Sequence, residues 1–167
     1  EPSVHLPSVL QPGLGAQLRS LQARHPDFSI EDLGVRVQGV YAAIQQAWSN
    51  GRWQDARPWV TDSLYQSLRF WIEEYTAHGL RNELRDIRLN RMQVVRVSTD
   101  AWYEAITLRI WGQMKDTVVD RSGTVVGGDP NLDRVFSEYW TFLRASGSGG
   151  AASDAHACPS CGAALDK

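Results

Sequence analysis

The spacing of apolar residues changes at Gly79, and this change constrains the fold more than any other feature of the sequence. Before Gly79 apolar residues recur every three or four positions, as on one face of a helix. After it they alternate with polar ones, as in strands with one face on a core. Helices followed by an antiparallel meander predict an α+β domain, in which the helices pack on one face of a curved sheet.

Three helices are predicted before the change. The first is short and amphipathic and stops before Pro26. Ser29 can cap the second, with Asp32 in its first turn, and the apolar stripe of this helix ends near Trp48. Thr61 can cap the third. Each boundary therefore has its own local signal.

Three strands are predicted after the change. The first covers 87–97, with a bulge near Arg91 where the alternation slips. The second has a core face that starts at Trp102 and includes Leu108, and its other face is also bulky, so cover on both sides is expected. The third covers 136–143. Helices on such a sheet leave a concave interior, which is a natural pocket.

The composition of the chain narrows the range of partners and functions that it can have. The chain has 167 residues, of which 43% are hydrophobic, enough for one core, and a formal net charge of −2. No global basic field therefore draws it to nucleic acid or anionic lipid, which leaves only local patches, and there is no specific nucleic-acid motif. No run approaches the ~18 apolar residues that span a bilayer. Because the chain opens at Glu1 without an initiator Met, we expect an upstream segment such as a removed signal peptide or a membrane anchor.

Catalytic templates are missing, and we expect a protein that is not an enzyme. The sequence has no GxSxG, P-loop or HExxH motif. Glu104 and Glu138 interrupt apolar strand faces, so either is a candidate base with a raised pKa for a small-molecule isomerase or hydrolase. The favoured alternative is a Glu–Arg pair across strands, or charges that protect a sheet edge.

The two cysteines form a CxxC motif at Cys158 and Cys161, after a Gly/Ser/Ala-rich stretch. Two thiolates at this spacing can hold one zinc ion, but zinc takes four ligands, so a second pair is needed. His156 is a candidate third ligand. The first half of a zinc ribbon is favoured over a disordered bystander and over a catalytic dithiol.

Two further groups of residues indicate binding. Aromatic side chains are numerous enough to line a pocket for an acyl chain or an apolar peptide segment, and the candidates are Trp48, Trp59, Trp71, Tyr75, Trp111 and Trp140. Arginines recur along the first strand and can form a stripe for phosphate headgroups or RNA backbone: Arg81, Arg85, Arg88, Arg91 and Arg96. A solvated strand face is the favoured alternative for the arginines.

Five segments in this order resemble the Tim44-like domain family: 26–32, 45–48, 57–65, 79–87 and 136–142. The resemblance covers 26–144 and implies a cone-shaped α+β fold similar to nuclear transport factor two, with a large apolar pocket. It implies non-enzymatic roles in inner-membrane association and in docking of import machinery or ribosomes. Residues 158–165 look like the start of the zinc ribbon that some bacterial relatives carry. The chain departs from the pattern where a linker replaces a further strand and where the second zinc knuckle is missing.

The predicted organisation is an arm and short helix at 1–25, the Tim44-like α+β domain at 26–144, a flexible linker at 145–157 and half a zinc ribbon at 158–167. The leading functional hypothesis is a binding or scaffold domain at a bacterial inner membrane, with a pocket for a lipid tail or an apolar peptide segment. The alternatives are an enzyme of the same fold using Glu104 or Glu138, and a docking module for the ribosome or translocase.

Overall fold

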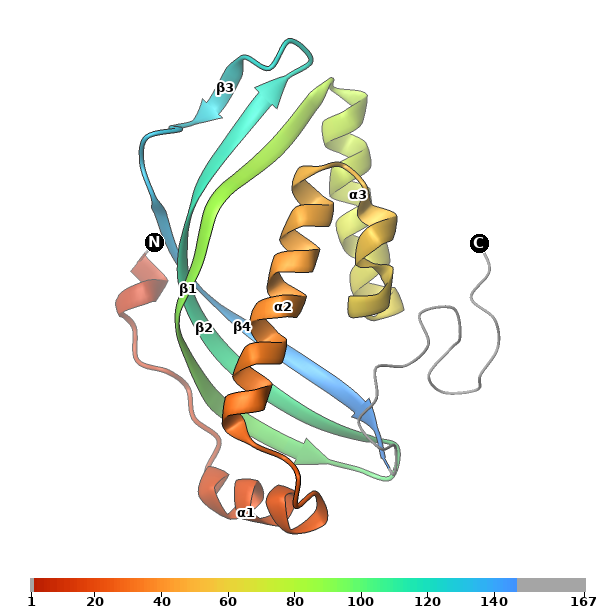
Figure 1. Ribbon diagram of the computed structural model, residues 1–167, viewed down its shortest axis with the longest axis vertical. Helices are drawn as coiled ribbons and strands as arrows, with labels where there is room; N and C mark the ends of the chain where they lie inside the picture. Colours follow the sequence, from red (N-terminus) through yellow and green to blue (C-terminus); the bar gives the residue numbers. More distant parts are fainter. Residues whose placement is uncertain (1, 147–167) are drawn as a thin grey trace.

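A curved antiparallel sheet holds the two longest helices on its concave side (Figure 1). The computed structural model describes residues 2–146. The elements in chain order are η1 (Pro2–His5), α1 (Leu14–Arg24), α2 (Ile30–Ser49), η2 (Trp53–Trp59), α3 (Asp62–Ala77), β1 (Leu80–Thr99), β2 (Tyr103–Asp120), β3 (Val125–Gly128) and β4 (Arg134–Ala145). The α+β class and the order of helices before strands are confirmed.

Local capping explains where the helices begin. The Ser29 hydroxyl accepts a hydrogen bond from the Asp32 amide at 2.9 Å, and the Thr61 hydroxyl accepts one from the Leu64 amide at 3.4 Å. Each bond satisfies an amide that has no partner within its helix. Both predicted caps are therefore confirmed.

The central strand of the sheet is β2. Strand β1 pairs with one edge of β2 along most of its length, and β3 and β4 share the other edge. The register of β1 shifts at three places, one of them between Leu89 and Arg91, which confirms the predicted bulge. Another shift lies beside Asp86, whose φ of 52° is in the left-handed region.

Three features of the sheet differ from the prediction. A short fourth strand, β3, pairs with the end of β2 where no strand was predicted. Strand β1 starts at Leu80 rather than at 87, because its polar first residues pair through the backbone and give no alternating pattern. Trp102, predicted on the core face, is 75% exposed in the turn before β2. Its amide and that of Tyr103 donate to the Asp100 carboxylate, both at 2.7 Å. The turn is therefore longer than expected, and Glu104 is the first inward residue of the strand.

The core has two parts that share α2. One buries α2 against β2 and β4, and its members are Val37, Tyr41, Leu108, Ile110, Met114 and Phe136. The other buries α2 against η2, and its members are Val40, Ile44, Ala47, Trp53 and Ala56. Helix α3 has no fully buried residue. It contributes partly buried side chains to the second part, so its attachment to the sheet is the less extensive one.

The predicted N-terminal arm lies along the convex side of the sheet, opposite α2 (Figure 1). It covers β2 there, so the expected cover on both sides of this strand is confirmed for Arg109, which is 2% exposed. The linker and the zinc-ribbon half lie outside the described residues, apart from Ala145 and Ser146.

Candidate functional site

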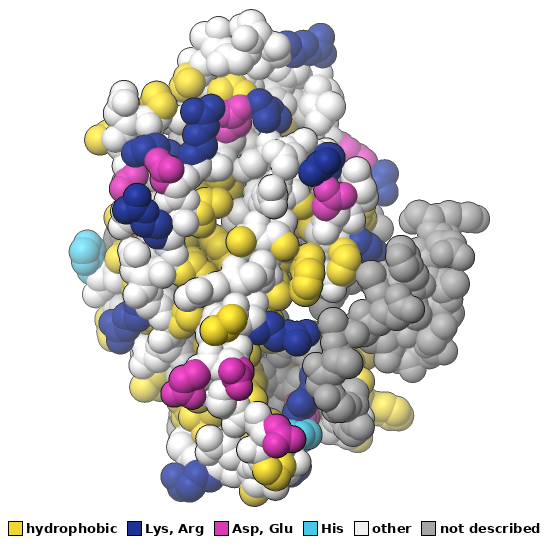
Figure 2. Space-filling view, in the orientation of Figure 1, with side chains coloured by type: hydrophobic (Ala, Val, Ile, Leu, Met, Phe, Trp, Pro, Cys, Tyr) yellow, Lys and Arg dark blue, Asp and Glu magenta, His cyan; other side chains and the backbone are white. Residues whose placement is uncertain are grey.

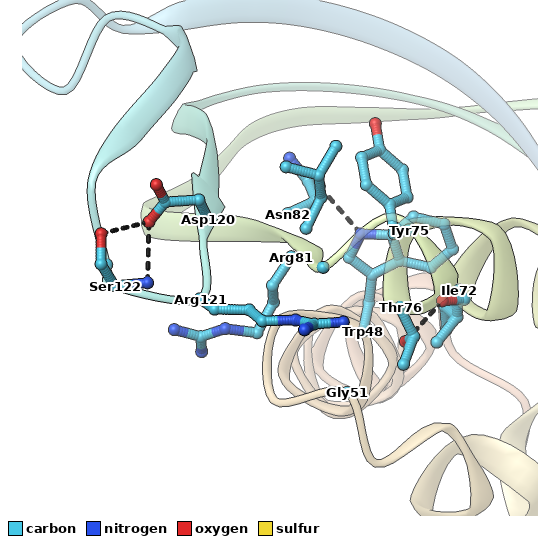
Figure 3. A pocket seen from close by; sticks show the side chains of 13 residues that line it. Trp48, Gly51, Ile72, Tyr75, Thr76, Arg81, Asn82, Asp120, Arg121 and Ser122 are labelled. Carbon is cyan, nitrogen blue, oxygen red and sulfur yellow. Dashed lines mark hydrogen bonds between the residues drawn. The ribbon is translucent and has the colours of Figure 1, made fainter.

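A cavity of about 530 Å³ opens where α2 and α3 end, beside the start of β1 and the turn after β2 (Figure 3). Its apolar wall comes from the two helices and the first residue of β1: Trp48, Ile72, Tyr75 and Leu80. The volume lies in the range of small-ligand sites in proteins.

Hydrogen bonds hold the back wall of the cavity in place. The Trp48 indole N–H donates to the Asn82 side-chain oxygen at 2.8 Å. The Asn82 amide group then donates to the Asp116 carboxylate at 2.7 Å and to the Thr117 carbonyl at 2.9 Å. This chain of bonds runs from α2 to β2 through β1, so the indole ring has a defined orientation.

Two arginines reach this cavity, Arg81 from β1 and Arg121 from the turn after β2 (Figure 3). Arg81 also donates to the Ser49 carbonyl at 3.2 Å and pairs with the Glu83 carboxylate. Within residues 2–146, the structure shows no ion pair for Arg121. The mouth of the cavity therefore has two guanidinium groups, of which only that of Arg81 is paired with a described carboxylate.

The acidic residue at the mouth, Asp120, is engaged in its own turn. Its carboxylate accepts from the Ser122 hydroxyl at 2.6 Å and from the Thr124 amide at 3.0 Å (Figure 3 shows the bonds to Ser122). These bonds lower the pKa of Asp120 below its ordinary value. Asp120 is thus ionised near neutral pH and shapes the loop that presents Arg121.

A second hollow of about 670 Å³ continues from the first along the concave side of the sheet. The two share Tyr75 and Asn82. The walls of the second hollow are largely polar, with Asp116, Asp133 and Arg134 among them. The combined space has one apolar wall and several charged groups, so it is more polar than the large apolar pocket implied by the resemblance.

The predicted pocket residues do not line one cavity. Trp48 and Tyr75 come together in the first cavity. Trp140 packs on Tyr41 at a ring distance of 5.0 Å and belongs to the core.

The other three tryptophans of the predicted set lie elsewhere. Trp71 and Trp59 are 56% and 42% exposed. Trp111 lies on the convex side of the sheet, under the arm, where its indole N–H donates to the Val4 carbonyl. Sequence spacing gave the relative faces of the strand residues but not what covers each face.

The five predicted surface arginines are all exposed but do not form one continuous stripe. Arg81 and Arg85 share the Glu83 carboxylate, and Arg91 stacks on the Trp111 ring at 4.5 Å. Arg88 and Arg96 are exposed further along β1. The three register shifts of β1 break the alternation that a stripe requires. On the face shown in Figure 2, Lys and Arg side chains are interspersed with Asp and Glu.

Glu104 is held by a cluster of basic groups and lines neither cavity. Its carboxylate contacts Arg24 at 3.0 Å, His25 at 2.7 Å and Arg144 at 2.5 Å. Burial opposes ionisation, but the hydrogen bonds from Arg144 and Arg24 and the nearby positive charges prevail, so the pKa of Glu104 lies below its ordinary value. Arg144 is its direct partner across β2 and β4, which confirms the cross-strand pair for Glu104.

Glu138 also lines neither cavity and accepts a hydrogen bond from the Trp140 indole at 2.8 Å. It lies close enough to Tyr41 to help raise the pKa of that buried phenol, although burial is the larger cause. Neither predicted carboxylate lines either of the two cavities described above.

Sequence reasoning missed Asn82 and Arg121. Asn82 falls in the polar start of β1, where no alternation drew attention to it. Arg121 sits next to Ser122 and Gly123, a recognisable turn, but only the pairing of β1 with β2 places that turn beside Trp48. The sequence therefore indicated the turn but not the residues that lie beside it in the fold.

Among residues 2–146 there is no group of three or more His, Cys, Asp or Glu side chains placed to hold a metal ion. Cys158 and Cys161, the predicted zinc ligands, lie outside the described residues. No helix in the described part of the chain is long and apolar enough to cross a membrane.

The family model described as Tim44-like domain matches residues 14–152. A search of curated proteins found no match. The matched range includes every helix and strand from α1 onward, and the arm precedes it.

Proposed function

This chain belongs to the Tim44-like domain family, and from that premise we propose that it is a non-enzymatic, membrane-associated binding domain whose cavity takes an acidic amphiphile. Membership indicates a membrane-associated or protein-transport-related role within a nuclear transport factor two-like fold. The further step concerns the ligand. An apolar tail would lie on the wall of the cavity, and its acidic headgroup would meet the arginines at the mouth.

The observation that carries the proposal is the combination of Trp48, Ile72 and Tyr75 on the wall with Arg81 and Arg121 at the mouth. Apolar surface favours burial of a hydrocarbon chain by about 25 cal/mol per Å². A guanidinium binds phosphate or carboxylate oxygens through paired N–H groups. A site with both features selects molecules that have both parts.

The guanidinium of Arg121 supports an acidic headgroup over a neutral one. Arg81 already has Glu83 as a partner, and Asp120 is engaged by its turn. Arg121 keeps its guanidinium for a ligand, because no described carboxylate pairs with it. An anion at the mouth would accept hydrogen bonds from the Arg121 guanidinium.

The enzymatic alternative has weaker support. A general base needs access to substrate and a pKa near the working pH. Glu104 is nearly buried, bound to three basic groups and lowered in pKa, which is the opposite of the raised value expected of such a base. Glu138 lines neither cavity.

Flotation with vesicles tests the proposal. The protein is mixed with vesicles of neutral lipid alone and with vesicles that also contain an acidic phospholipid. We expect binding to the acidic vesicles, and loss of most of it in the double variant Arg81→Gln/Arg121→Gln. Native mass spectrometry of the purified protein should show a bound lipid that the double variant lacks.

The matched control is Arg85→Gln/Arg96→Gln, which removes the same charge from exposed positions of β1 outside the cavity. Retained binding in this control supports a specific site. Equal loss in both double variants would instead support docking through general surface charge, as in the ribosome or translocase alternative. Absence of binding to any vesicle, with no ligand in the mass spectrum, would refute the lipid proposal.

A further inference from the structure

The arm that lies along the convex side of the sheet, residues 4–11, is bound through its backbone and through two of its side chains. The Ser8 hydroxyl donates to the Gln93 side-chain oxygen at 2.7 Å, and the Gln11 side chain accepts from the Val97 amide at 2.8 Å. The backbone of the arm makes further hydrogen bonds. The Arg109 guanidinium donates to the Leu6 carbonyl at 2.8 Å, and the Tyr139 hydroxyl accepts from the Val9 amide at 3.2 Å. At its end, the Gln11 amide donates to a carbonyl of β1, at 2.9 Å. These groups of the sheet contact carbonyl oxygens, which every residue type possesses, and amides, which every residue type except proline possesses.

The arm's apolar side chains contribute little to this contact. Leu6, Val9 and Leu10 are 63%, 80% and 50% exposed. In a segment that belongs to the permanent core, such side chains would point inward, because burial of apolar surface is the main source of stability. The arm is therefore attached as a ligand peptide is, by main-chain hydrogen bonds over a prepared surface.

That surface is built by the strands. The Arg109 guanidinium lies over the rings of Trp111 at 4.5 Å and Tyr139 at 5.5 Å, and donates to the Ser137 hydroxyl at 3.1 Å. All four side chains come from β2 and β4, and Arg109 is almost completely buried beneath the arm. Because strand residues hold the Arg109 guanidinium in position, it can donate to the carbonyl of another peptide that replaces the arm.

We propose that the convex side of the sheet is a docking site for an extended segment of another polypeptide, and that the arm occupies this site as an intramolecular ligand. The partner segment needs carbonyl groups spaced to reach Arg109 and Trp111, and free amides where Val9 and Gln11 have theirs. Its side chains are weakly specified where Leu6, Val9 and Leu10 of the arm face away, and polar at the two positions where the Ser8 and Gln11 side chains bond to β1. The site lies on the opposite side of the sheet from the cavity, so either proposal can fail without the other.

Weakening the arm makes the site measurable in the full chain. The Gln11 side chain accepts a hydrogen bond from the Val97 amide at 2.8 Å, so Gln11→Ala loosens the arm without changing Arg109, Trp111 or Tyr139. A fluorescent peptide with the sequence of residues 3–12 should bind this variant about fivefold more tightly than the wild type, as expected for one lost hydrogen bond. Gln17→Ala, an exposed change on α1, should leave binding at the wild-type value.

Altered peptides test what is recognised. A peptide with alanine at the positions of the exposed Leu6, Val9 and Leu10 should bind Gln11→Ala within about threefold of the original, since the backbone and the bonded polar side chains are unchanged. A peptide N-methylated at the positions of Val9 and Gln11 should lose at least about tenfold, because both amide donors are removed. Hydrogen exchange at the arm's own amides should become faster as the peptide saturates the protein.

Three results would overturn the proposal. One is that no peptide binds Gln11→Ala. Another is that the peptide binds but exchange at the arm's amides stays slow, which would place it elsewhere. The third is a concentration-dependent dimer of the wild type that the peptide dissociates, because the natural occupant would then be the arm of a second copy.

Discussion

The cluster around Glu104 predicts a large and pH-dependent effect of Glu104→Gln. The carboxylate is 6% exposed and binds Arg24, His25 and Arg144. Removing one member of a buried charged pair costs about 3–5 kcal/mol when the remaining charge stays buried. Here the basic side chains are 40%, 25% and 28% exposed, so water can solvate them after the change. The expected loss in unfolding free energy is therefore reduced to about 2–3 kcal/mol.

The direction of the pH dependence follows from the lowered pKa. A lowered folded-state pKa stabilises the protein above the ordinary value of 4.5, and this contribution disappears as pH falls through the lowered value. Urea unfolding at neutral pH should thus show the full difference between wild type and Glu104→Gln. At a pH below the lowered pKa the two proteins should have nearly equal stability. Thermal midpoints at neutral pH should differ by roughly 6–9 °C.

A matched control is Glu73→Gln, which breaks the exposed pair with Arg69 on α3 and should cost only about 0.3–0.5 kcal/mol. A double-mutant cycle of Glu104→Gln with Arg144→Gln should give a clear coupling energy. A loss under about 0.5 kcal/mol for Glu104→Gln, or one that persists undiminished in acid, would refute the reasoning about this cluster.

Two other predictions concern the core and α2, and calorimetry or urea unfolding checks both. Tyr41→Phe should be neutral or stabilise by about 1 kcal/mol, because the buried hydroxyl has no hydrogen-bond partner among the described residues; a loss above about 1 kcal/mol would reveal one. Gly112→Ala should lower the unfolding free energy by about 1–3 kcal/mol, because its new methyl group would come within 2.6 Å of both Phe136 and the Arg88 carbonyl. The new methyl group of Gly39→Ala in α2 meets no atom within 4 Å, so this change should raise the unfolding free energy by about 0.5–1 kcal/mol. Equal effects of the two glycine changes would contradict this account.

Much of the fold could be predicted because its signals are local. Ser29 and Thr61 cap helices through bonds to residues three positions away, so the sequence contains both partners. The change of period at Gly79 separates the helices from the sheet, since side chains repeat differently along the two structures. The start of β1 could not be predicted, because Arg81 and Asn82 are both polar and pair with β2 through backbone groups, which leave no pattern in the sequence.

The candidate site was harder to predict, because its members are distant in the chain. Trp48 and Arg121 meet only because β1 and β2 pair along their full length and bring the turn after β2 to the end of α2. Trp111 and Trp140 were expected to share a pocket with Trp48. The sheet instead places Trp111 under the arm and Trp140 in the core. Spacing within a strand gives relative faces, but it does not say what covers each face.

The sequence by itself determined the class of the fold, the helix boundaries and the family, because periodicity, caps and ordered motifs are properties of neighbouring residues. Only the tertiary structure decided that Glu104 is held by three basic groups, that Arg109 is buried beneath the arm, and that Arg121 stands at the mouth of a cavity. Each of these depends on which distant segments lie against one another. Burial and charge pairing act through space, and a single sequence does not specify those distances.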